Sequence, residues 1–303
     1  MSSHAYINNP ENMNIYININ GELFSRADAK ISVFDSGFLL GDGVWEGIRL
    51  HNNQLVFIDD HLDRLFESAK GISLEIPFSK TQIIDEISKV LIKNNMTDGV
   101  HIRLVISRGE KITPYQNPNV NIGPITLVII PEYKHTDPDT YKKGIIIGRV
   151  STVRPPHNIL STHYNTLSKL NCILASIEAN ELSYDEGIMN DPHGNISTCN
   201  STNLFFIKDN SVWTSKGEYC LNGITRSKAI YLCEKNDINC YQKDFTFDEI
   251  KDCDEAFVTG TFAGIIPVSS LENRNLSSIK SSSLTNQIRD LYNNHINEKI
   301  DKV

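Results

Sequence analysis

Two segments in the C-terminal half of the sequence have residues that can bind a phosphate group. In "NGITRSKAI", Gly223, Ile224 and Thr225 come just before a predicted helix, where free backbone amides and the positive end of the helix dipole attract an anion. In "VTGTFAG", the hydroxyls of Thr259 and Thr261 stand beside glycines, which let the backbone approach a ligand closely.

Arg64, in "HLDRL", adds a cation from the N-terminal half of the chain. Taken singly, each of these segments has an ordinary explanation, because most arginines on helices are solvated and Gly-Ile-Thr-Arg can simply begin a helix. Taken together, they indicate a site for a small phosphorylated molecule.

One lysine, Lys169, stands in "THYNTLSKLNCILASIEANELSYDEGI", at the beginning of a segment predicted to be helical over 167–182. A lysine amine that is desolvated beside a cation or an apolar wall has the lowered pKa that imine formation requires. Whether Lys169 has such surroundings, and so holds a cofactor, is the question that this segment raises.

His101 and Arg103, in "HIR", alternate along a predicted strand and therefore lie on one face of it. By itself this placement is also that of two exposed strand residues.

The elements predicted around these residues are those of an α+β protein. "MNIYININGELF" predicts a hairpin that turns at Asn20 and Gly21, because two alternating runs flank a turn dipeptide. "DDHLDRLFESAKGI" predicts a helix with Asp59 or Asp60 as its N-cap, and a second predicted helix starts near Ser79. The segments "GVHIRLVISRG" and "GPITLVIIPEY" are typical of strands because they are rich in β-branched residues.

A polar, proline-containing segment divides the chain into two predicted domains. "PEYKHTDPDT" predicts a linker over 132–139, between an N-terminal α+β domain over 1–131 and a C-terminal domain over 140–303. In the second half, "GIIIGRV", "LFFIKDNSVWTS" and "EAFVTGT" are typical of strands, and 226–236 is typical of a helix.

The composition argues against several kinds of function. The six cysteines form no Cys-x-x-Cys pair, so neither a zinc site nor a disulfide framework is expected. A formal net charge of −8 without a basic stripe argues against a nucleic-acid partner. No run approaches the roughly 18 apolar residues of a membrane-spanning helix, and "MSSHAYINNPENMN" lacks the features of a secretory signal. We therefore expect a cytoplasmic protein with no membrane partner.

The order and spacing of several motifs resemble the branched-chain aminotransferase family, the class IV or fold type IV pyridoxal-phosphate enzymes. These motifs span nearly the whole chain: "GFLLGDGVWEGIR", "FIDDHLDRL", "HIRLVISRG", "DEGIMNDPHGNIS", "NLFFI", "NGITR" and "VTGTFAG". The resemblance implies a small α+β N-terminal domain and a larger β-barrel-like C-terminal domain. It also implies pyridoxal 5'-phosphate as cofactor and a homodimer with active sites near the domain and subunit boundary.

The same resemblance assigns roles to the candidate residues. The phosphate of the cofactor is held by four of them: Arg64, Ile224, Thr225 and Thr261. His101 and Arg103 fall where the family usually shows Tyr-x-Arg in a strand facing the substrate, so they are implied to orient it.

The sequence departs from the family pattern at the lysine that forms the Schiff base. The family shows a pattern like Lys-x-x-Asn-x-Leu-x-Asn-Val-Leu-Ala, and an ungapped match over 170–175 puts Asn165 at the lysine position. Residues four apart on a helix lie about 5–6 Å from each other, so a helical Lys169 could reach the same aldehyde carbon. Either Lys169 is the catalytic lysine, or it is a structural lysine and the site lacks one.

A second departure is Thr198 in "GNISTCNSTNLFF", where the family has a glutamate. That glutamate keeps the pyridine nitrogen protonated, and the protonated ring withdraws electrons from Cα. A neutral hydroxyl is a weaker partner, so Thr198 predicts either a weaker transaminase or a reaction retuned towards elimination.

The sequence therefore predicts a pyridoxal-phosphate-dependent aminotransferase that moves an amino group between an amino acid or amine and a 2-oxo acid. Lys169 is the predicted general base and acid. Two alternatives remain open. Thr198 favours a pyridoxal-phosphate lyase of the aminodeoxychorismate-lyase type, and Asn165 favours a non-catalytic or lysine-less descendant that keeps the phosphate-binding cup.

Overall fold

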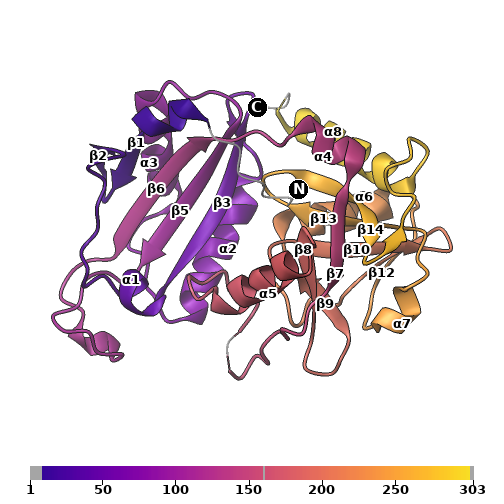
Figure 1. The fold of residues 1–303 in the computed structure, drawn as a ribbon. Coiled ribbons are helices and arrows are strands. Elements are labelled where there is room, and N and C mark those ends of the chain that lie inside the picture. Colours follow the sequence, from indigo (N-terminus) through magenta and orange to yellow (C-terminus); the bar gives the residue numbers. More distant parts are fainter. Residues whose placement is uncertain (1–8, 160, 301–303) are drawn as a thin grey trace. The chain divides into compact units, whose positions relative to one another are not determined.

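The computed structural model describes residues 9–159 and 161–300, and the contacts among them define two compact units (Figure 1). The N-terminal unit comprises the described residues up to His135 together with the short segment Tyr164–Lys169. The rest of the chain from residue 136 onwards forms the C-terminal unit. The segment that carries Lys169 thus belongs to the N-terminal unit although the chain has already entered the second one.

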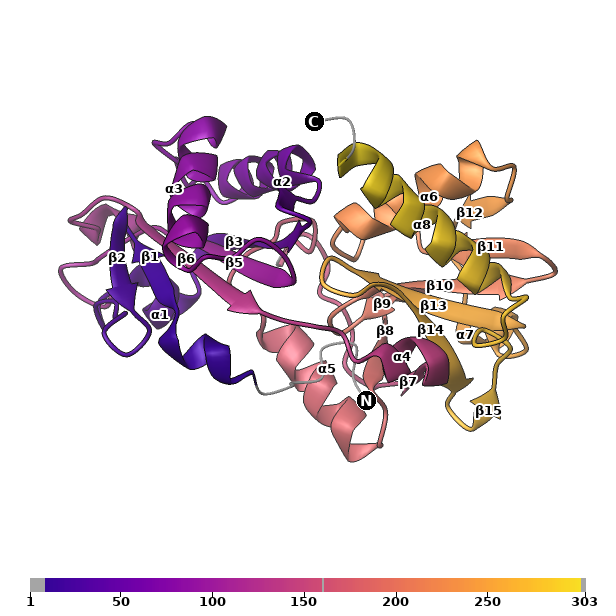
Figure 2. The same cartoon turned by 90° about the horizontal axis from the view of Figure 1, so that it is seen from above.

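The N-terminal unit is an antiparallel sheet with two long helices. Its strands run in the order β2-β1-β6-β5-β3-β4. Figure 2 shows α2 and α3 on the same face of this sheet. Its elements are η1 (Pro10–Asn14), β1 (Tyr16–Ile19), β2 (Glu22–Ser25), α1 (Ser36–Leu40), β3 (Gly43–His51), β4 (Gln54–Leu55), α2 (Ile58–Gly71), α3 (Lys80–Lys93), β5 (Val100–Ser107), η2 (Pro118–Val120) and β6 (Thr126–Tyr133).

The first hairpin and the start of α3 follow the local sequence. Asn20 and Gly21 have φ values of 54° and 89°, the left-handed conformations of a two-residue hairpin turn between β1 and β2. Ser79 caps α3 and forms a reciprocal capping box with Gln82. Both predictions are confirmed.

The predicted start of α2 is wrong. Its N-cap is Phe57, in a left-handed conformation and without a side-chain cap, while Asp59 and Asp60 lie in the first turn. The short strand β4 ends two residues before Phe57, so strand pairing determines how the chain enters the helix. The two carboxylates still lie where the helix dipole favours negative charge.

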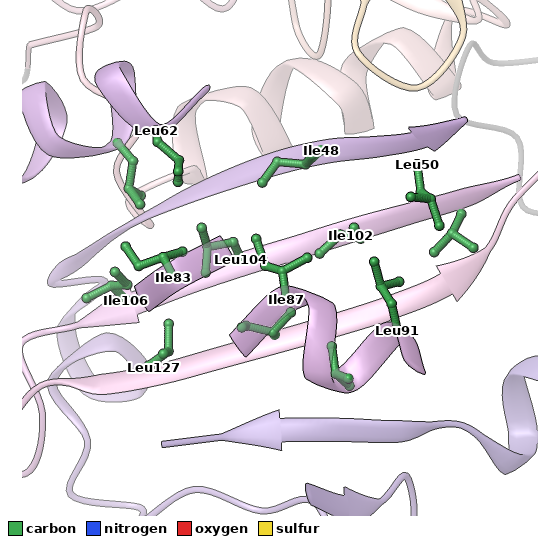
Figure 3. Close-up of a cluster of buried hydrophobic side chains, with 14 of the residues drawn as sticks. Ile48, Leu50, Leu62, Ile83, Ile87, Leu91, Ile102, Leu104, Ile106 and Leu127 are labelled. Atoms are coloured by element: carbon green, nitrogen blue, oxygen red, sulfur yellow. The ribbon is translucent and has the colours of Figure 1, made fainter. Parts of the chain in front are cut away.

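A continuous apolar core fills the space between this sheet and its two helices. Figure 3 shows the side chains of the strands pointing towards those of the helices. The labelled members are Ile48, Leu50, Leu62, Ile83, Ile87, Leu91, Ile102, Leu104, Ile106 and Leu127. Because side chains alternate along a strand, the residues between them in β3 and β5, including Trp45 and Arg103, lie on the opposite face.

The C-terminal unit is built on a mixed, curled sheet. Its strands run in the order β12-β11-β10-β13-β14-β7-β8-β9, and β15 pairs with β14. Helices α6 and α8 lie together on one face of this sheet (Figure 2). Its elements are α4 (Pro138–Lys143), β7 (Ile145–Arg149), α5 (Leu170–Glu181), β8 (Glu186–Asn190), β9 (Ile196–Cys199), β10 (Asn203–Lys208), β11 (Ser211–Thr214), α6 (Ile224–Lys235), β12 (Cys240–Gln242), α7 (Phe247–Ile250), β13 (Glu255–Gly260), β14 (Gly264–Leu271), β15 (Arg274–Asn275) and α8 (Leu284–Ile300).

The curl brings the last strand of the order back towards the middle of the sheet. The backbone N–H of Cys199 in β9 donates to the carbonyl of Thr202, immediately before β10, at 3.0 Å. The predicted α+β fold with a barrel-like C-terminal part is confirmed. The predicted domain limits at residues 131 and 140 stay a prediction.

Candidate active site

The segment that carries Lys169 runs alongside β3. The N–H of Trp45 donates to the carbonyl of Asn165 at 3.0 Å, and the N–H of Leu167 donates to the carbonyl of Gly43 at 2.9 Å. These two bonds extend the sheet along the first half of β3. The position of Lys169 is therefore determined by the sheet of the N-terminal unit.

Two glycines let this segment approach so closely. A Cβ on Gly71, at the end of α2, would stand 2.2 Å from Cζ of Tyr164. A Cβ on Gly43 would stand 2.7 Å from Cδ1 of Leu167. Both distances are far below van der Waals contact, so only glycine fits at these places.

The amine of Lys169 reaches back to Asn165. Nζ of Lys169 donates to Oδ1 of Asn165 at 3.0 Å and lies 5.5 Å from the ring centroid of Trp45. The prediction that residues 165 to 169 share a helix face is wrong, because α5 begins only at Leu170 and the preceding residues are irregular. A backbone hydrogen bond to β3 holds Asn165 in place, and the long lysine side chain makes the contact.

His101 and Arg103 lie on the outer face of the sheet, as their spacing predicts. The guanidinium carbon of Arg103 is 4.2 Å from the ring centroid of Trp45, within the range of a cation–π contact. Nε2 of His101 would stand 2.8 Å from a Cβ on Gly47, so that glycine makes room for the imidazole. The cationic groups of Arg103 and Lys169 thus both lie within 6 Å of the ring centroid of Trp45.

Arg64 is held by a buried carboxylate that the sequence analysis missed. Nε and Nη2 of Arg64 donate to the two carboxylate oxygens of Glu46 at 2.8 and 2.7 Å, and Nδ1 of His61 lies 2.7 Å from Oε2 of Glu46. Burial by itself raises the pKa of Glu46. The charge and hydrogen bonds of Arg64, with those of His61, outweigh that effect and lower the pKa below its ordinary value.

The spacing of these residues contained a signal for this ion cluster. His61 and Arg64 are three apart on α2 and therefore lie on one face of the helix. Glu46 is flanked by the buried Val44 and Ile48 in the alternation of β3, which puts its carboxylate on the core face, where it needs a partner.

In the C-terminal unit, the segment "NGITR" contains the start of α6. Its N-cap is Gly223, which offers no side-chain cap hydrogen bond. A Cβ on Gly223 would stand 2.3 Å from Oδ1 of Asn203, so the glycine packs directly on β10. The hydroxyl of Thr225 lies 3.4 Å from that of Tyr292 in α8. Ile224 and Thr225 are the first two residues of the helix.

The "VTGTFAG" turn lies beside this helix start. Thr259 in β13 pairs with Asn203 in β10, the residue on which Gly223 packs. The hydroxyl of Thr259 is buried and has no hydrogen-bond partner among the described residues. Thr261, half-buried, is in the turn between β13 and β14. Within this unit the two predicted phosphate-binding segments therefore both contact Asn203, and one of them contains the buried hydroxyl without a partner.

Thr198 lies in β9 with its hydroxyl already committed as a donor. Oγ1 of Thr198 donates to the carbonyl of Thr202 at 2.8 Å, and the hydroxyl of Thr202 donates to the buried carboxylate of Glu186 at 2.6 Å. Since a hydroxyl has one proton, Thr198 can offer a further group only its lone pairs. It can accept a hydrogen bond but cannot supply a negative charge.

The predicted site residues are thus divided between the units. Within the N-terminal unit are Arg64, His101, Arg103 and Lys169. Within the C-terminal unit are Thr198, Ile224, Thr225 and Thr261. A surface hollow of about 450 Å³ at the end of α2 includes none of them; it is lined by Phe66, Ala69, Lys70, Ser73, Leu74, Glu75 and Ile76.

No group of His, Cys, Asp and Glu side chains in 9–159 or 161–300 has the arrangement of a metal site. The cysteines are free, and burial raises the pKa of the Cys253 thiol to about 11. In the same part of the chain, no helix has the combination of length and apolar character needed to cross a membrane.

Comparison with known proteins decides the family. The pattern of the amino-transferase class IV family matches residues 43–271, which include most of both units. The chain belongs to this family. The predicted resemblance is therefore confirmed over about three quarters of the sequence.

Individual relatives agree with this assignment. The branched-chain-amino-acid aminotransferase-like protein 2 of Arabidopsis thaliana is 36% identical over 287 residues, which cover 93% of this chain and 50% of the relative. A putative branched-chain-amino-acid aminotransferase of Methanocaldococcus jannaschii is 33% identical and covers 92% of this chain and 95% of its own length. This class IV chain spans about half the length of the Arabidopsis relatives it matches.

The fold of this class IV chain also matches solved structures. The branched-chain aminotransferase of the thermophilic archaeon Thermoproteus uzoniensis, solved with norvaline, superposes with a TM-score of 0.84 at 26% identity. The match covers 95% of this chain and 96% of that one. The fold type IV architecture is thereby confirmed.

Proposed function

We propose that this chain is a pyridoxal-phosphate-dependent aminotransferase that moves an amino group between an amino acid or amine and a 2-oxo acid. The observation that carries the proposal is the uncapped start of α6 next to the orphaned hydroxyl of Thr259. Free amides at a helix start bind phosphate, and a ligand atom or an ordered water can satisfy a buried hydroxyl that has no protein partner. Membership of class IV makes pyridoxal 5'-phosphate the ligand that fits.

Four groups of the chain are suited to the phosphate of this cofactor. The backbone of Ile224 and Thr225 with the hydroxyl of Thr261 would hold its phosphate, together with the guanidinium of Arg64. The paired bonds to Glu46 fix the orientation of that guanidinium, and its five N–H donors allow one arginine to bind a carboxylate and a phosphate at once. When bound, the cofactor supplies an aldehyde that takes the amino group and a ring that withdraws electrons.

Lys169 is the residue proposed to transfer the proton of the substrate carbon during the reaction. Its side chain is half-buried and its amine is held at Asn165, beside the ring of Trp45. A lysine in such a place can take a proton from a substrate carbon and return it to a neighbouring one. His101 and Arg103, on the same face of the sheet as Trp45, would orient the substrate carboxylate.

Thr198 is proposed to face the ring nitrogen of the cofactor. The hydroxyl of Thr198 already donates its hydrogen bond to the carbonyl of Thr202, so it can only accept one from a protonated ring nitrogen. It has no negative charge to stabilise the protonated form of that nitrogen. We expect a slower transaminase than one with a carboxylate at this place. Neither the class IV match nor the described geometry favours the lyase alternative.

We also propose a homodimer, because the N-terminal unit exposes an apolar patch. Two segments contribute to it, one over 33–40 that includes α1 and one over 112–122, and a hydrogen bond from the N–H of Lys111 to the carbonyl of Phe34 at 3.0 Å joins them. The exposed members include Phe38 at 66% and Ile112 at 68%; the others are Val33, Phe34, Leu40, Tyr115 and Ile122. Patches of this kind on an otherwise folded unit mark contact surfaces.

Sedimentation at micromolar concentration should show a dimer, and Phe38→Glu should shift it towards the monomer. A parent protein that sediments as a monomer while turning over substrate would rule out this part of the proposal. The cytoplasmic location stays a prediction of the sequence.

The central experiment is the visible spectrum of the purified protein with pyridoxal phosphate, followed by borohydride reduction and peptide mapping. We expect the cofactor to be attached at Lys169 alone. Lys169→Ala should then lose both the attachment and turnover, by a factor of about 10² or more. If reduction labels no lysine, the lysine-less alternative replaces the aminotransferase. Lys143→Ala, a change on the exposed surface of α4, is the control.

A further inference from the structure

Asn165 uses every one of its polar groups within the N-terminal unit. Its backbone N–H donates to Oγ of Ser68 at 3.0 Å, and its carbonyl accepts from the N–H of Trp45 at 3.0 Å. Its side-chain nitrogen donates to the carbonyl of Trp45 at 2.7 Å, and its side-chain oxygen accepts from Nζ of Lys169 at 3.0 Å. The residue is 1% exposed, so these contacts are made without competition from water.

The orientation of this amide is decided by chemistry. The carbonyl of Trp45 can only accept a hydrogen bond, so the NH₂ group of Asn165 must face it. The oxygen of Asn165 must therefore point the other way, where the amine of Lys169 stands as a donor. A flipped amide would set oxygen against oxygen and nitrogen against nitrogen.

The elements that hold the backbone of Asn165 are a strand and a helix of the N-terminal unit. Trp45 is inside β3, where it pairs with Val105 of β5, and Ser68 is a buried residue of α2. A strand on one side and a helix on the other therefore hold the backbone of Asn165. The amide oxygen of Asn165 therefore has a defined position, and the flexible side chain of Lys169 forms its hydrogen bond there.

The neutrality of the acceptor also matters. A carboxylate at this distance would favour the charged form of the lysine strongly, whereas an amide oxygen does so much less. An asparagine can therefore hold the amine in place and still let it lose its proton. This property suits a residue that must take up and release protons.

From these contacts we propose that Asn165 is a positioning residue for Lys169: it holds the amine against the ring of Trp45 without fixing its charge. The inference deepens the proposed function and rests on it for the role of Lys169. The contact between the two side chains, however, is a property of the chain itself. It can be tested with and without the cofactor.

The test is the pH dependence with which acetic anhydride modifies Lys169 in the full-length protein, read by peptide mass spectrometry. In Asn165→Asp the midpoint of modification should rise by about one pH unit or more, because an opposite charge then faces the amine. In Asn165→Leu, which has a similar shape but no acceptor, modification at a given pH should be several-fold faster. Lys143, exposed on α4, serves as the internal reference.

Asn94→Asp is the matched control. Asn94 also donates its side-chain amide to a backbone carbonyl, that of Tyr16, at 2.9 Å in the same unit. Its conversion should leave the midpoint of Lys169 unchanged. An equal shift in both aspartate variants, or no shift in Asn165→Asp, would overturn the proposal. If Asn165→Leu does not fold, the comparison of the two aspartate variants still decides.

Failure of the proposed function gives a different pattern. If Asn165→Asp moves the midpoint while borohydride attaches pyridoxal phosphate to no lysine, Asn165 holds Lys169 but the amine is not catalytic. If the cofactor is attached at Lys169 in both the parent and Asn165→Asp with unmoved midpoints, the catalytic role holds and the positioning role is wrong.

Discussion

The two units hold their candidate site residues by different means. In the N-terminal unit, Arg64 and Lys169 are long side chains, and each is held by a buried partner, Glu46 or Asn165. In the C-terminal unit, the candidate phosphate-binding groups are backbone amides and short hydroxyls at the start of α6 and in the turn after β13. Side chains with many rotamers need partners to define their position, whereas groups on the backbone are positioned by the fold itself.

This difference predicts that substitutions beside the site will destabilise the N-terminal unit more than the C-terminal one. The largest effect should come from Glu46→Ala, which leaves Arg64 and His61 without their buried carboxylate. We expect a loss of about 3–5 kcal/mol in the free energy of unfolding, measured by urea denaturation.

The control for that substitution is Glu132→Ala. Glu132 pairs with Arg26 at 2.8 Å, but both side chains are about 40% exposed. An exposed pair contributes about 1 kcal/mol or less. Equal losses in the two variants would mean that the buried cluster has no special weight.

Gly71→Ala tests how the segment of Lys169 is docked on the N-terminal unit. The added Cβ would meet the ring of Tyr164 at 2.2 Å, and overpacking of this kind costs about 1–3 kcal/mol. The acetylation of Lys169 should also become faster as its segment loosens. In a Tyr164→Ala background the same glycine change should cost much less, and a cost that stays the same would contradict the proposed contact.

The loss of stability at acidic pH is a third test, and it is again specific to the N-terminal unit. The pKa of Glu46 is lowered from 4.5 in the folded chain, so the carboxylate contributes stability above that pH. The contribution is lost as the pH falls through the lowered folded value. Between pH 6 and pH 3, the free energy of unfolding measured by urea denaturation should therefore fall less in Glu46→Gln than in the parent. The difference should be about 1.4 kcal/mol for each unit by which the pKa of Glu46 is lowered. Parallel curves for the two proteins would contradict this assignment.

The smallest effect, and one of opposite sign, is expected in the C-terminal unit. Thr259→Val replaces a buried hydroxyl that has no partner in the described chain with a methyl group of the same size. Without cofactor, the free energy of unfolding should rise by up to about 1 kcal/mol. Retention of pyridoxal phosphate, followed by its absorbance during dialysis, should weaken.

The contrast for this change is Thr285→Val. Its hydroxyl is equally buried but donates to Glu255 at 2.7 Å, so its removal should destabilise by about 1–3 kcal/mol. If Thr259→Val lowers the free energy of unfolding as much as Thr285→Val does, the hydroxyl of Thr259 already has a hydrogen-bond partner in the folded chain and is not available to a ligand.

Local sequence was sufficient wherever neighbouring residues decide the conformation. The turn at Asn20 and Gly21 and the capping box of Ser79 and Gln82 follow from residues at most three apart. The helix predicted over 226–236 also follows from its own residues, and α6 begins two residues earlier, after Gly223.

Local sequence failed where a distant strand decided. Periodicity predicted a helix from residue 167, but hydrogen bonds from Asn165 and Leu167 to β3 hold this segment beside the strand, and α5 begins only at Leu170. The predicted N-cap of α2 was wrong for a similar reason, since β4 determines the entry at Phe57.

Motif order and residue types were enough to identify the family of this protein, its α+β class and the groups that can do chemistry, because all of these can be read along a single chain. Which of those groups meet became clear only from the packed structure. There the amine of Lys169 lies on the oxygen of Asn165, and Arg64 lies on the carboxylate of Glu46. Such contacts depend on strands and helices packing together, and residue spacing alone does not specify that packing.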